Sequence, residues 1–237
     1  ALAIKAGLPP GALNIVTGVG EEAGAALTSH PGIDFVSFTG SPEVGRMVQE
    51  AAAKHHLPVV LELGGKSPQI MFEDADLELA ATTVCKAITQ NAGQTCSAGS
   101  RVLVQRAVVD RFQALLADRF ARLRIGRPED DADLGPLINA TQQRRVLDFI
   151  ENARRDKLPL IAQAAVPATM SDGFFVPPTV FGPVPAEHPL VCQEVFGPVL
   201  ALQVFDTEDD AVTLANGTEF GLVAGVWTRD GARQQRM

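Results

Sequence analysis

The stretch Val59-Val60-Leu61-Glu62-Leu63-Gly64-Gly65-Lys66 marks the point where the chain changes its pattern. The apolar, β-branched residues before the glycines predict a buried strand. In the segment before it, residues 33–38 predict another strand and residues 43–54 a helix, with Ser41 as N-cap and Pro42 at the first helical position. Strand, turn and helix in succession are typical of a parallel sheet flanked by helices, so we expect an α/β fold.

The pattern changes at Gly64-Gly65, where we place a boundary between residues 1–63 and residues 64–237. Among the elements expected before it are a strand at 13–16 and a helix at 21–27. The helix at 141–155 is expected to be capped by Thr141. The remaining elements expected after the boundary are strands at 68–72, 101–105, 159–164, 174–180, 199–205 and 222–228, and helices at 77–90, 108–123 and 207–215.

Composition excludes several classes of protein. The 237 residues are 46% hydrophobic and carry 20 Lys and Arg against 28 Asp and Glu, a net charge of −8. With no basic run, a nucleic-acid partner is not expected. No apolar run approaches the ~20 residues of a membrane span, so no membrane partner is expected either. The three widely spaced cysteines argue against a disulfide framework and favour a reducing, cytoplasmic location.

The two ends of the chain suggest a fragment. The sequence begins at an alanine without an initiator methionine, inside a predicted helix, and it also ends inside a predicted helix. We therefore expect an internal piece of a longer protein.

One cysteine stands apart from the other two. Cys96 lies in Asn91-Ala92-Gly93-Gln94-Thr95-Cys96-Ser97-Ala98-Gly99, among glycines and small polar residues that follow a predicted helix. Such a thiol can be exposed and can ionise to the reactive thiolate. Structural roles are expected for the other two cysteines, because Cys85 lies on the apolar side of its helix and Cys192 has no neighbouring residue in the sequence that could activate its thiol.

Glu62 is the candidate general base. It interrupts an apolar strand, and Val60, Leu61 and Leu63 predict a weakly polar setting of the kind that suits proton abstraction. A solvated carboxylate at a strand end is the simpler alternative. The four histidines have no metal-ligand spacing, so no metal site is expected.

Two glycine turns could approach a phosphate. Gly18-Val19-Gly20 with Gly24 has the wrong spacing for a dinucleotide loop and favours a tight turn. Thr39-Gly40-Ser41 followed by Gly45 is a better candidate, because it follows a strand and opens a helix whose amides can bind an anion. Gly64-Gly65-Lys66-Ser67 is not a P-loop, since residue 60 is valine where that motif needs glycine.

Four motifs together resemble the NAD(P)-dependent aldehyde dehydrogenase superfamily in order and spacing. They are Phe38-Thr39-Gly40-Ser41, Leu61-Glu62-Leu63-Gly64-Gly65-Lys66, Gly93-Gln94-Thr95-Cys96 and Glu194-Val195-Phe196-Gly197-Pro198. The resemblance covers the whole chain. It implies a partial Rossmann-like, dinucleotide-binding domain over residues 1–63 and an α/β catalytic domain over residues 64–237 that is incomplete at its C-terminal end.

The resemblance also implies a mechanism. Cys96 would attack a small-molecule aldehyde to give a thiohemiacetal, whose hydride passes to NAD or NADP. The thioester left on Cys96 would be hydrolysed by a water that Glu62 deprotonates, which favours release of a free acid over transfer to coenzyme A. The Cys96 amide would be one oxyanion donor, and an asparagine upstream of the chain the other.

Cofactor contacts are implied residue by residue. The pyrophosphate would lie near Thr39, Gly40 and Ser41, in a pocket shaped by Gly20, Gly24 and Gly45. The nicotinamide side would meet the Leu63 carbonyl, the Glu194 carboxylate at the ribose, the Phe196 ring and, more loosely, Gln142. For Phe196 the alternative is a core aromatic.

Two other functions remain open at this point. A cofactor-independent thiol esterase would use Cys96 with a histidine partner, although no histidine is suitably placed. The chain could also be a non-catalytic fragment that lacks the upstream asparagine and half of its cofactor site. By the resemblance, the complete protein is expected to be a homo-oligomer.

Overall fold

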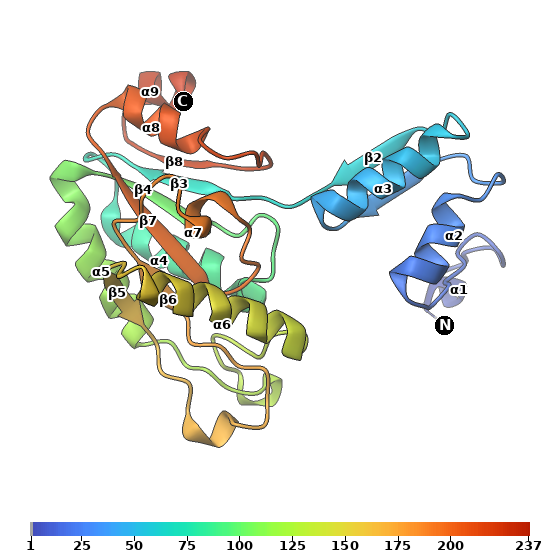
Figure 1. The fold of residues 1–237 in the computed structure, drawn as a ribbon, viewed down its shortest axis with the longest axis horizontal. Helices are drawn as coiled ribbons and strands as arrows, with labels where there is room; N and C mark the ends of the chain where they lie inside the picture. Colours follow the sequence, from blue (N-terminus) through green and yellow to red (C-terminus); the bar gives the residue numbers. More distant parts are fainter. Residues whose placement is uncertain (1) are drawn as a thin grey trace. The chain divides into compact units, whose positions relative to one another are not determined.

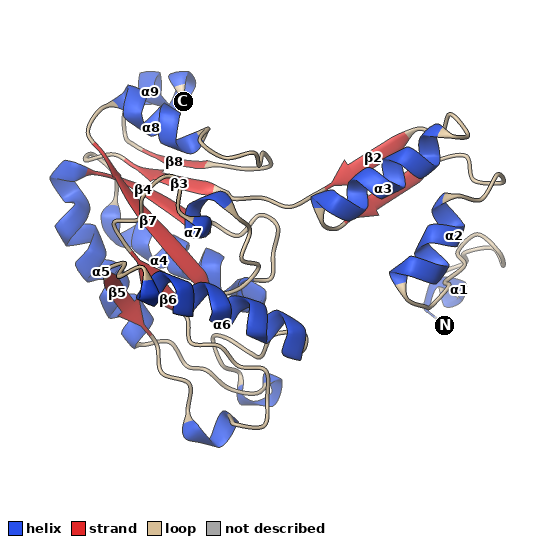
Figure 2. Cartoon of the chain, viewed as in Figure 1, coloured by secondary structure: helices blue, strands red, loops and turns tan. Residues whose placement is uncertain are grey.

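The computed structural model describes residues 2–237, which form two compact units, one ending at Leu63 and the other spanning Gly64–Met237 (Figure 1). Both units combine helices with parallel strands (Figure 2). The α/β class expected from the sequence is therefore confirmed.

The first unit is built on two parallel strands, β1 (Val36–Thr39) and β2 (Val59–Glu62), which pair from Val36–Val59 to Thr39–Glu62. Helix α3 (Pro42–Ala53) connects them and packs on the sheet. The remaining elements of this unit are α1 (Leu2–Lys5), a π-helical turn (Gly20–Gly24) and α2 (Ala25–Thr28).

The helix α3 begins where the sequence predicts. The Ser41 hydroxyl accepts a hydrogen bond from the Val44 amide at 3.3 Å, and Pro42 occupies the first turn. The strand predicted at 13–16 is wrong. A segment becomes a strand only by pairing its backbone with a neighbour, and within residues 2–237 these residues pair with no strand; the Ile15 side chain is 80% exposed.

The second unit contains a six-stranded sheet in the order β5-β6-β7-β4-β3-β8. All neighbouring strands are parallel except β5 and β6, which are antiparallel. The strands are β3 (Pro68–Met71), β4 (Arg101–Gln105), β5 (Leu160–Gln163), β6 (Thr179–Phe181), β7 (Val199–Phe205) and β8 (Gly225–Trp227). The helices are α4 (Leu77–Thr89), α5 (Val109–Ala121), α6 (Ala140–Arg155), α7 (Pro189–Cys192), α8 (Glu208–Ala215) and α9 (Gly231–Arg236).

Helices cover both faces of this sheet (Figure 2), and each strand alternates between the two faces. Val102 and Val104 of β4 pack in one cluster with α4 and α5, including Phe112. Leu103 points to the other side and packs with Ala211 of α8. A third cluster lies between α6, β6 and β7.

Two boundaries in this unit differ from the sequence prediction. The N-cap of α6 is Asn139, whose side chain accepts from the Gln142 amide at 2.9 Å, so Thr141 is already inside the helix. The strand predicted at 174–180 is confined to Thr179–Phe181. Pro177 and Pro178 have no backbone N–H to donate to a sheet, which accounts for the late start.

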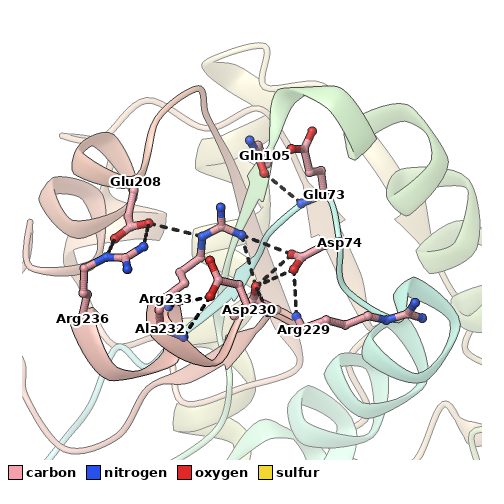
Figure 3. Close-up of polar contacts among 10 residues, drawn as sticks. Glu73, Asp74, Gln105, Glu208, Arg229, Asp230, Ala232, Arg233 and Arg236 are labelled. Carbon is pink, nitrogen blue, oxygen red and sulfur yellow. Dashed lines mark hydrogen bonds and ion pairs between the residues drawn. The ribbon is translucent and has the colours of Figure 1, made fainter.

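The helix α9 is attached to the sheet by a polar network (Figure 3). The Asp74 carboxylate accepts from the Thr228 hydroxyl, the Arg229 amide and Arg233. Glu208 of α8 pairs with Arg233 and, at 2.7 Å, with Arg236. The loop after β3 therefore tethers a helix more than 150 residues away in the sequence.

Within residues 2–237, no helix combines the length and the apolar character that crossing a bilayer requires. The same residues contain no group of three or more His, Cys, Asp and Glu side chains placed to bind a metal ion.

Candidate active site

The loop that carries Cys96 has an unusual backbone. After α4, Asn91, Ala92 and Gly93 all adopt positive φ angles of 51°, 54° and 73°. Gly93 lies directly against the backbone of Gly197, with no room for a side chain. A left-handed glycine in such close contact cannot be replaced without moving one of the two loops.

Hydrogen bonds fix the same loop on both sides. The Asn91 side chain donates to the Gln94 carbonyl at 2.9 Å, and the Gln94 side chain donates back to the Asn91 carbonyl at 3.1 Å. The Gln94 side-chain oxygen also accepts from the Ile138 amide at 3.0 Å. These hydrogen bonds fix the residues just before Cys96, and none of them involves Cys96 itself.

Cys96 lies in a turn and is half-buried, in agreement with the exposure expected from its small neighbours. Its backbone N–H makes no hydrogen bond with any residue from 2 to 237, so it is available to a ligand. Cys85, in contrast, is buried, and burial raises the pKa of its thiol to about 11. A thiol in that state is protonated near neutral pH and a poor nucleophile.

The loop from Glu194 to Gly197 lies beside the cysteine loop. One Glu194 carboxylate oxygen accepts from the Gly65 amide at 3.1 Å, and a Cβ on Gly64 would lie 2.5 Å from the other oxygen. A Cβ on Gly65 would lie 2.5 Å from the Cys96 carbonyl oxygen. Side chains at Gly64 and Gly65 would therefore collide with the Glu194 carboxylate and the Cys96 carbonyl.

Helix α6 supports the Glu194 loop from the other side. Gln142 donates to the carbonyls of Val195 and Phe196 at 3.1 and 2.8 Å, and Arg145 donates to the Glu194 carbonyl at 2.8 Å. Phe196 has a φ of 56° and a 38% exposed side chain, so the core alternative for this residue is wrong. Arg145 was not predicted from the sequence, although it follows Gln142 by three residues on the same helix face.

Two buried cations lie behind these loops and were also missed. Arg101 of β4 donates to the Lys66, Leu214 and Ala215 carbonyls at 2.7–2.8 Å. Lys66 is only 1% exposed. Arg101 could have been noticed in the sequence because it directly precedes the apolar run Val102-Leu103-Val104, which predicts a buried strand. A charge buried in such a strand needs compensating hydrogen bonds.

Glu62 ends β2 in the first unit. Its backbone carbonyl accepts from the Gly40 amide at 3.0 Å, which places it beside the predicted phosphate turn. The prediction of a weakly polar setting for the Glu62 carboxylate is wrong. Side chains alternate along a strand, so Glu62 points to the same exposed side as Val60, while Val59 and Leu61 are half-buried.

The turn between β1 and α3 has the features that bind an anion. Thr39, Gly40 and Ser41 are exposed at the start of a 12-residue helix, whose N-terminal amides carry partial positive charge. Gly45 packs under the Leu63 side chain, where a Cβ would come within 2.5 Å of it. These residues fit a pyrophosphate.

The other glycine turn has a looser geometry. Gly20 and Gly24 begin and end the π-helical turn, and a Cβ at either position would meet no atom within 4 Å. Neither glycine is required by close packing within this unit.

The predicted site residues thus form two groups. In the first unit, Thr39, Gly40, Ser41 and Glu62 lie at the carboxyl ends of the paired strands, with Gly45 and Leu63 in contact nearby. In the second unit, Cys96, Glu194, Phe196 and Gln142 lie around Gly64-Gly65 and Gly197.

Known proteins are similar to this chain in sequence and in fold. The model of the aldehyde dehydrogenase family matches residues 1–237. The betaine aldehyde dehydrogenase of Cereibacter sphaeroides is 46% identical over 235 residues, which are 99% of this chain and 48% of that protein.

Solved structures give the same result. A Burkholderia cenocepacia protein assigned to the aldehyde dehydrogenases has a TM-score of 0.97 at 58% identity, over 99% of this chain and 50% of that one. An aldehyde dehydrogenase of Pseudomonas syringae, in complex with NAD+ and octanal, has a TM-score of 0.94 at 38% identity, over 99% and 49% of the two chains. The chain spans about half the length of these relatives.

Proposed function

The chain belongs to the aldehyde dehydrogenase family, and from that premise we propose that it contributes the reacting cysteine and the water-activating glutamate to an NAD(P)-dependent oxidation of an aldehyde to a free carboxylic acid. One observation carries the proposal. Gly65 lies so close to the Cys96 carbonyl that a Cβ would be 2.5 Å from its oxygen, and its amide donates to the Glu194 carboxylate, so the cysteine loop and a candidate ribose-binding carboxylate share one support.

In this proposal Cys96 is the nucleophile. Its thiolate attacks the aldehyde carbon, and the free Cys96 N–H donates to the oxyanion that develops. When bound, NAD(P)+ supplies the acceptor for the hydride that leaves the substrate carbon. The thioester remaining on Cys96 is then open to attack by water.

Glu62 is proposed to activate that water. Only Leu63 and Gly64 separate Glu62 from Gly65, and three residues span at most about 11 Å. The covalent chain therefore keeps Glu62 near the glycine that packs on Cys96, whatever the arrangement of the two units. An exposed carboxylate is also free to accept a proton from water.

The cofactor is proposed to use both units. In the first unit, Thr39, Gly40 and Ser41 would bind the pyrophosphate at the N-terminus of α3, with Gly20, Gly24 and Gly45 around them, and the Leu63 carbonyl would face the nicotinamide. In the second unit, Glu194 would bind the nicotinamide ribose and the exposed Phe196 would contact the ring. Gln142 would act by holding that loop in place.

The test uses the complete protein of which this chain is part. Cys96→Ala should reduce aldehyde oxidation by at least about 1,000-fold, because it removes the proposed nucleophile that forms the thioester. Glu62→Gln should give a single burst of NADH followed by slow turnover, since the acyl group stays on Cys96. Cys85→Ala, which removes a buried thiol, is the matched control and should keep normal turnover.

Steady turnover without a burst in Glu62→Gln would contradict the role of Glu62 alone. Normal activity in Cys96→Ala would overturn the proposed function. An activity that survives in every cofactor-site variant and hydrolyses esters without nucleotide would favour the thiol esterase alternative instead.

A further inference from the structure

The loop of residues 216–224, which joins α8 to β8 (Figure 1), contains an apolar residue in a rare backbone conformation. Leu222 has a φ angle of 105°, and its side chain is 45% exposed. A residue with a Cβ adopts such a φ only at an energetic cost, and conformations of this kind concentrate at functional sites. An exposed leucine alone would need no explanation, but an exposed leucine in a strained conformation does.

Leu222 lies against the glycine that supports the cysteine loop. A Cβ on Gly65 would lie 2.5 Å from the Cys96 carbonyl oxygen and 3.4 Å from a methyl group of Leu222. The Ser67 hydroxyl is also 3.4 Å from this position, but Ser67 is buried. Leu222 is therefore the side chain that presents an exposed surface close to the Cys96 backbone.

The proposed ribose-binding carboxylate lies at a different position. The three atoms nearest to a Cβ on Gly64 all belong to Glu194. Two of the three nearest to a Cβ on Gly65 belong instead to Cys96 and Leu222. Leu222 is thus grouped with the proposed nucleophile. Because an apolar side chain offers no hydrogen bond, what it contributes to a bound molecule is the burial of apolar surface.

Both ends of the loop that carries Leu222 are fixed within the second unit. Before it, the Arg101 guanidinium binds the last two carbonyls of α8, those of residues 214 and 215, at 2.7 and 2.8 Å. After it, Gly225 of β8 pairs with Gln69 of β3 and packs so closely on the Gln69 side chain that no Cβ would fit. These contacts constrain the loop in which the strained leucine lies.

We propose that Leu222 is a specificity-determining residue, which lines the aldehyde pocket beside Cys96 with an apolar surface and makes the site prefer aldehydes with an aliphatic chain. The proposal rests on the proposed function, which makes Cys96 the nucleophile that the aldehyde carbon must approach. A longer aldehyde bound at Cys96 extends its chain along Leu222, and each methylene group that is covered strengthens binding of the transition state. Acetaldehyde has no such chain.

The test measures kcat/KM for acetaldehyde, butanal and hexanal with the complete protein at a saturating concentration of the cofactor. Leu222→Asn keeps nearly the size of the side chain, removes its apolar character and introduces a residue that tolerates positive φ. The ratio of kcat/KM for hexanal to that for acetaldehyde should fall about tenfold or more. Leu222→Met, which keeps an apolar side chain, should retain most of the original ratio.

Two further variants complete the design. Val223→Asn is the matched control, because Val223 is the next residue and is equally exposed at 45%, and it should leave the ratio unchanged. Leu222→Gly replaces Leu222→Asn if the latter fails to fold, since glycine adopts this φ without strain. It should lower the ratio in the same way.

An equal fall of kcat/KM for all three aldehydes would overturn the proposal, because Leu222 would then support the loop without contacting the chain. A raised KM for the cofactor with an unchanged aldehyde ratio would also overturn it. The proposed function fails separately, through normal activity of Cys96→Ala. If Cys96→Ala is inactive and Leu222→Asn leaves the ratio unchanged, only the role of Leu222 is wrong.

Discussion

The two units support their predicted site residues in different ways. Among residues 2–63 of the first unit, only Val36, Val48 and Ala52 form the buried apolar set, and many large apolar side chains are exposed. In the second, three clusters of buried residues fill both faces of a six-stranded sheet. The Cys96 and Glu194 loops therefore rest on a large core, whereas Glu62 and the predicted phosphate turn at Thr39–Ser41 rest on one helix and two strands.

The largest expected difference is in hydrogen exchange of the backbone amides. Strands β4 and β7 are buried in the middle of the larger sheet, and their amides should exchange at least about 1,000-fold more slowly than those of β1 and β2. Mass spectrometry of the chain after timed exposure to D2O measures both. Equal protection in the two units would contradict the expectation that the second unit has the more stable core.

Truncation of a buried side chain should also distinguish the stabilities of the two units. Phe112→Ala, at a fully buried position of α5, should lower the free energy of unfolding of the second unit by about 3–5 kcal/mol. The fluorescence of Trp227 in β8, the single tryptophan of the chain, reports that unit during urea unfolding. Val48→Ala, at a buried position of the first unit, should leave the Trp227 transition within about 0.5 kcal/mol.

Lys66 should make the second unit less stable at low pH. Its pKa falls from 10.5 in the unfolded chain to about 7 in the folded one, so the unfolded state binds more protons between these values. Stability therefore rises with pH from 7 to 10.5. Lys66→Met should stabilise the unit by about 1–4 kcal/mol below pH 7 and show no gain above pH 10.5. A gain that is the same at every pH would contradict this origin.

The smallest expected effect is at the attachment of α9. Asp74→Ala removes the acceptor for Thr228, Arg229 and Arg233, and should cost about 1–2 kcal/mol in the Trp227 transition. Asp206→Ala, which breaks an exposed pair with Arg106, should cost less than about 0.5 kcal/mol. Equal losses in the two variants would show that the network adds nothing beyond a surface pair.

The same network should respond to acid. A hydrogen bond from Arg236 is the main cause that lowers the pKa of Glu208 from 4.5 to about 2. The stabilisation from this carboxylate is present above pH 4.5 and is lost as pH falls toward 2. Amides of α9 should therefore lose protection in this window before those of β4.

Local signals explain what the sequence predicted well. Strands β4 and β7 match their predicted ranges, α3 begins at the expected cap and α4 begins at the expected residue, because periodicity and capping depend on neighbouring residues. The prediction of a strand at 13–16 was wrong because a strand must pair with another strand, and local periodicity does not show whether such a partner exists. Asn139 was missed because Asn139 and Thr141 are both suitable N-cap residues and lie only two positions apart.

The site divides in the same way. Cys96, Glu62 and Glu194 could be predicted because each stands in a short motif. The support of the Glu194 loop by Arg145, and the burial of Lys66, depend on contacts between segments far apart in the chain. Periodicity does not report such contacts.

Arg101 has a consequence for how the protein is made. Its guanidinium binds the carbonyls of Leu214 and Ala215, which follow it by 113 and 114 residues. At about 5–20 residues per second, a ribosome needs roughly 6–20 s to deliver them after Arg101 has been synthesised. During that interval β4 contains a cation whose final acceptors do not yet exist. Closure of the larger sheet around Arg101 must therefore wait until α8 has left the ribosome.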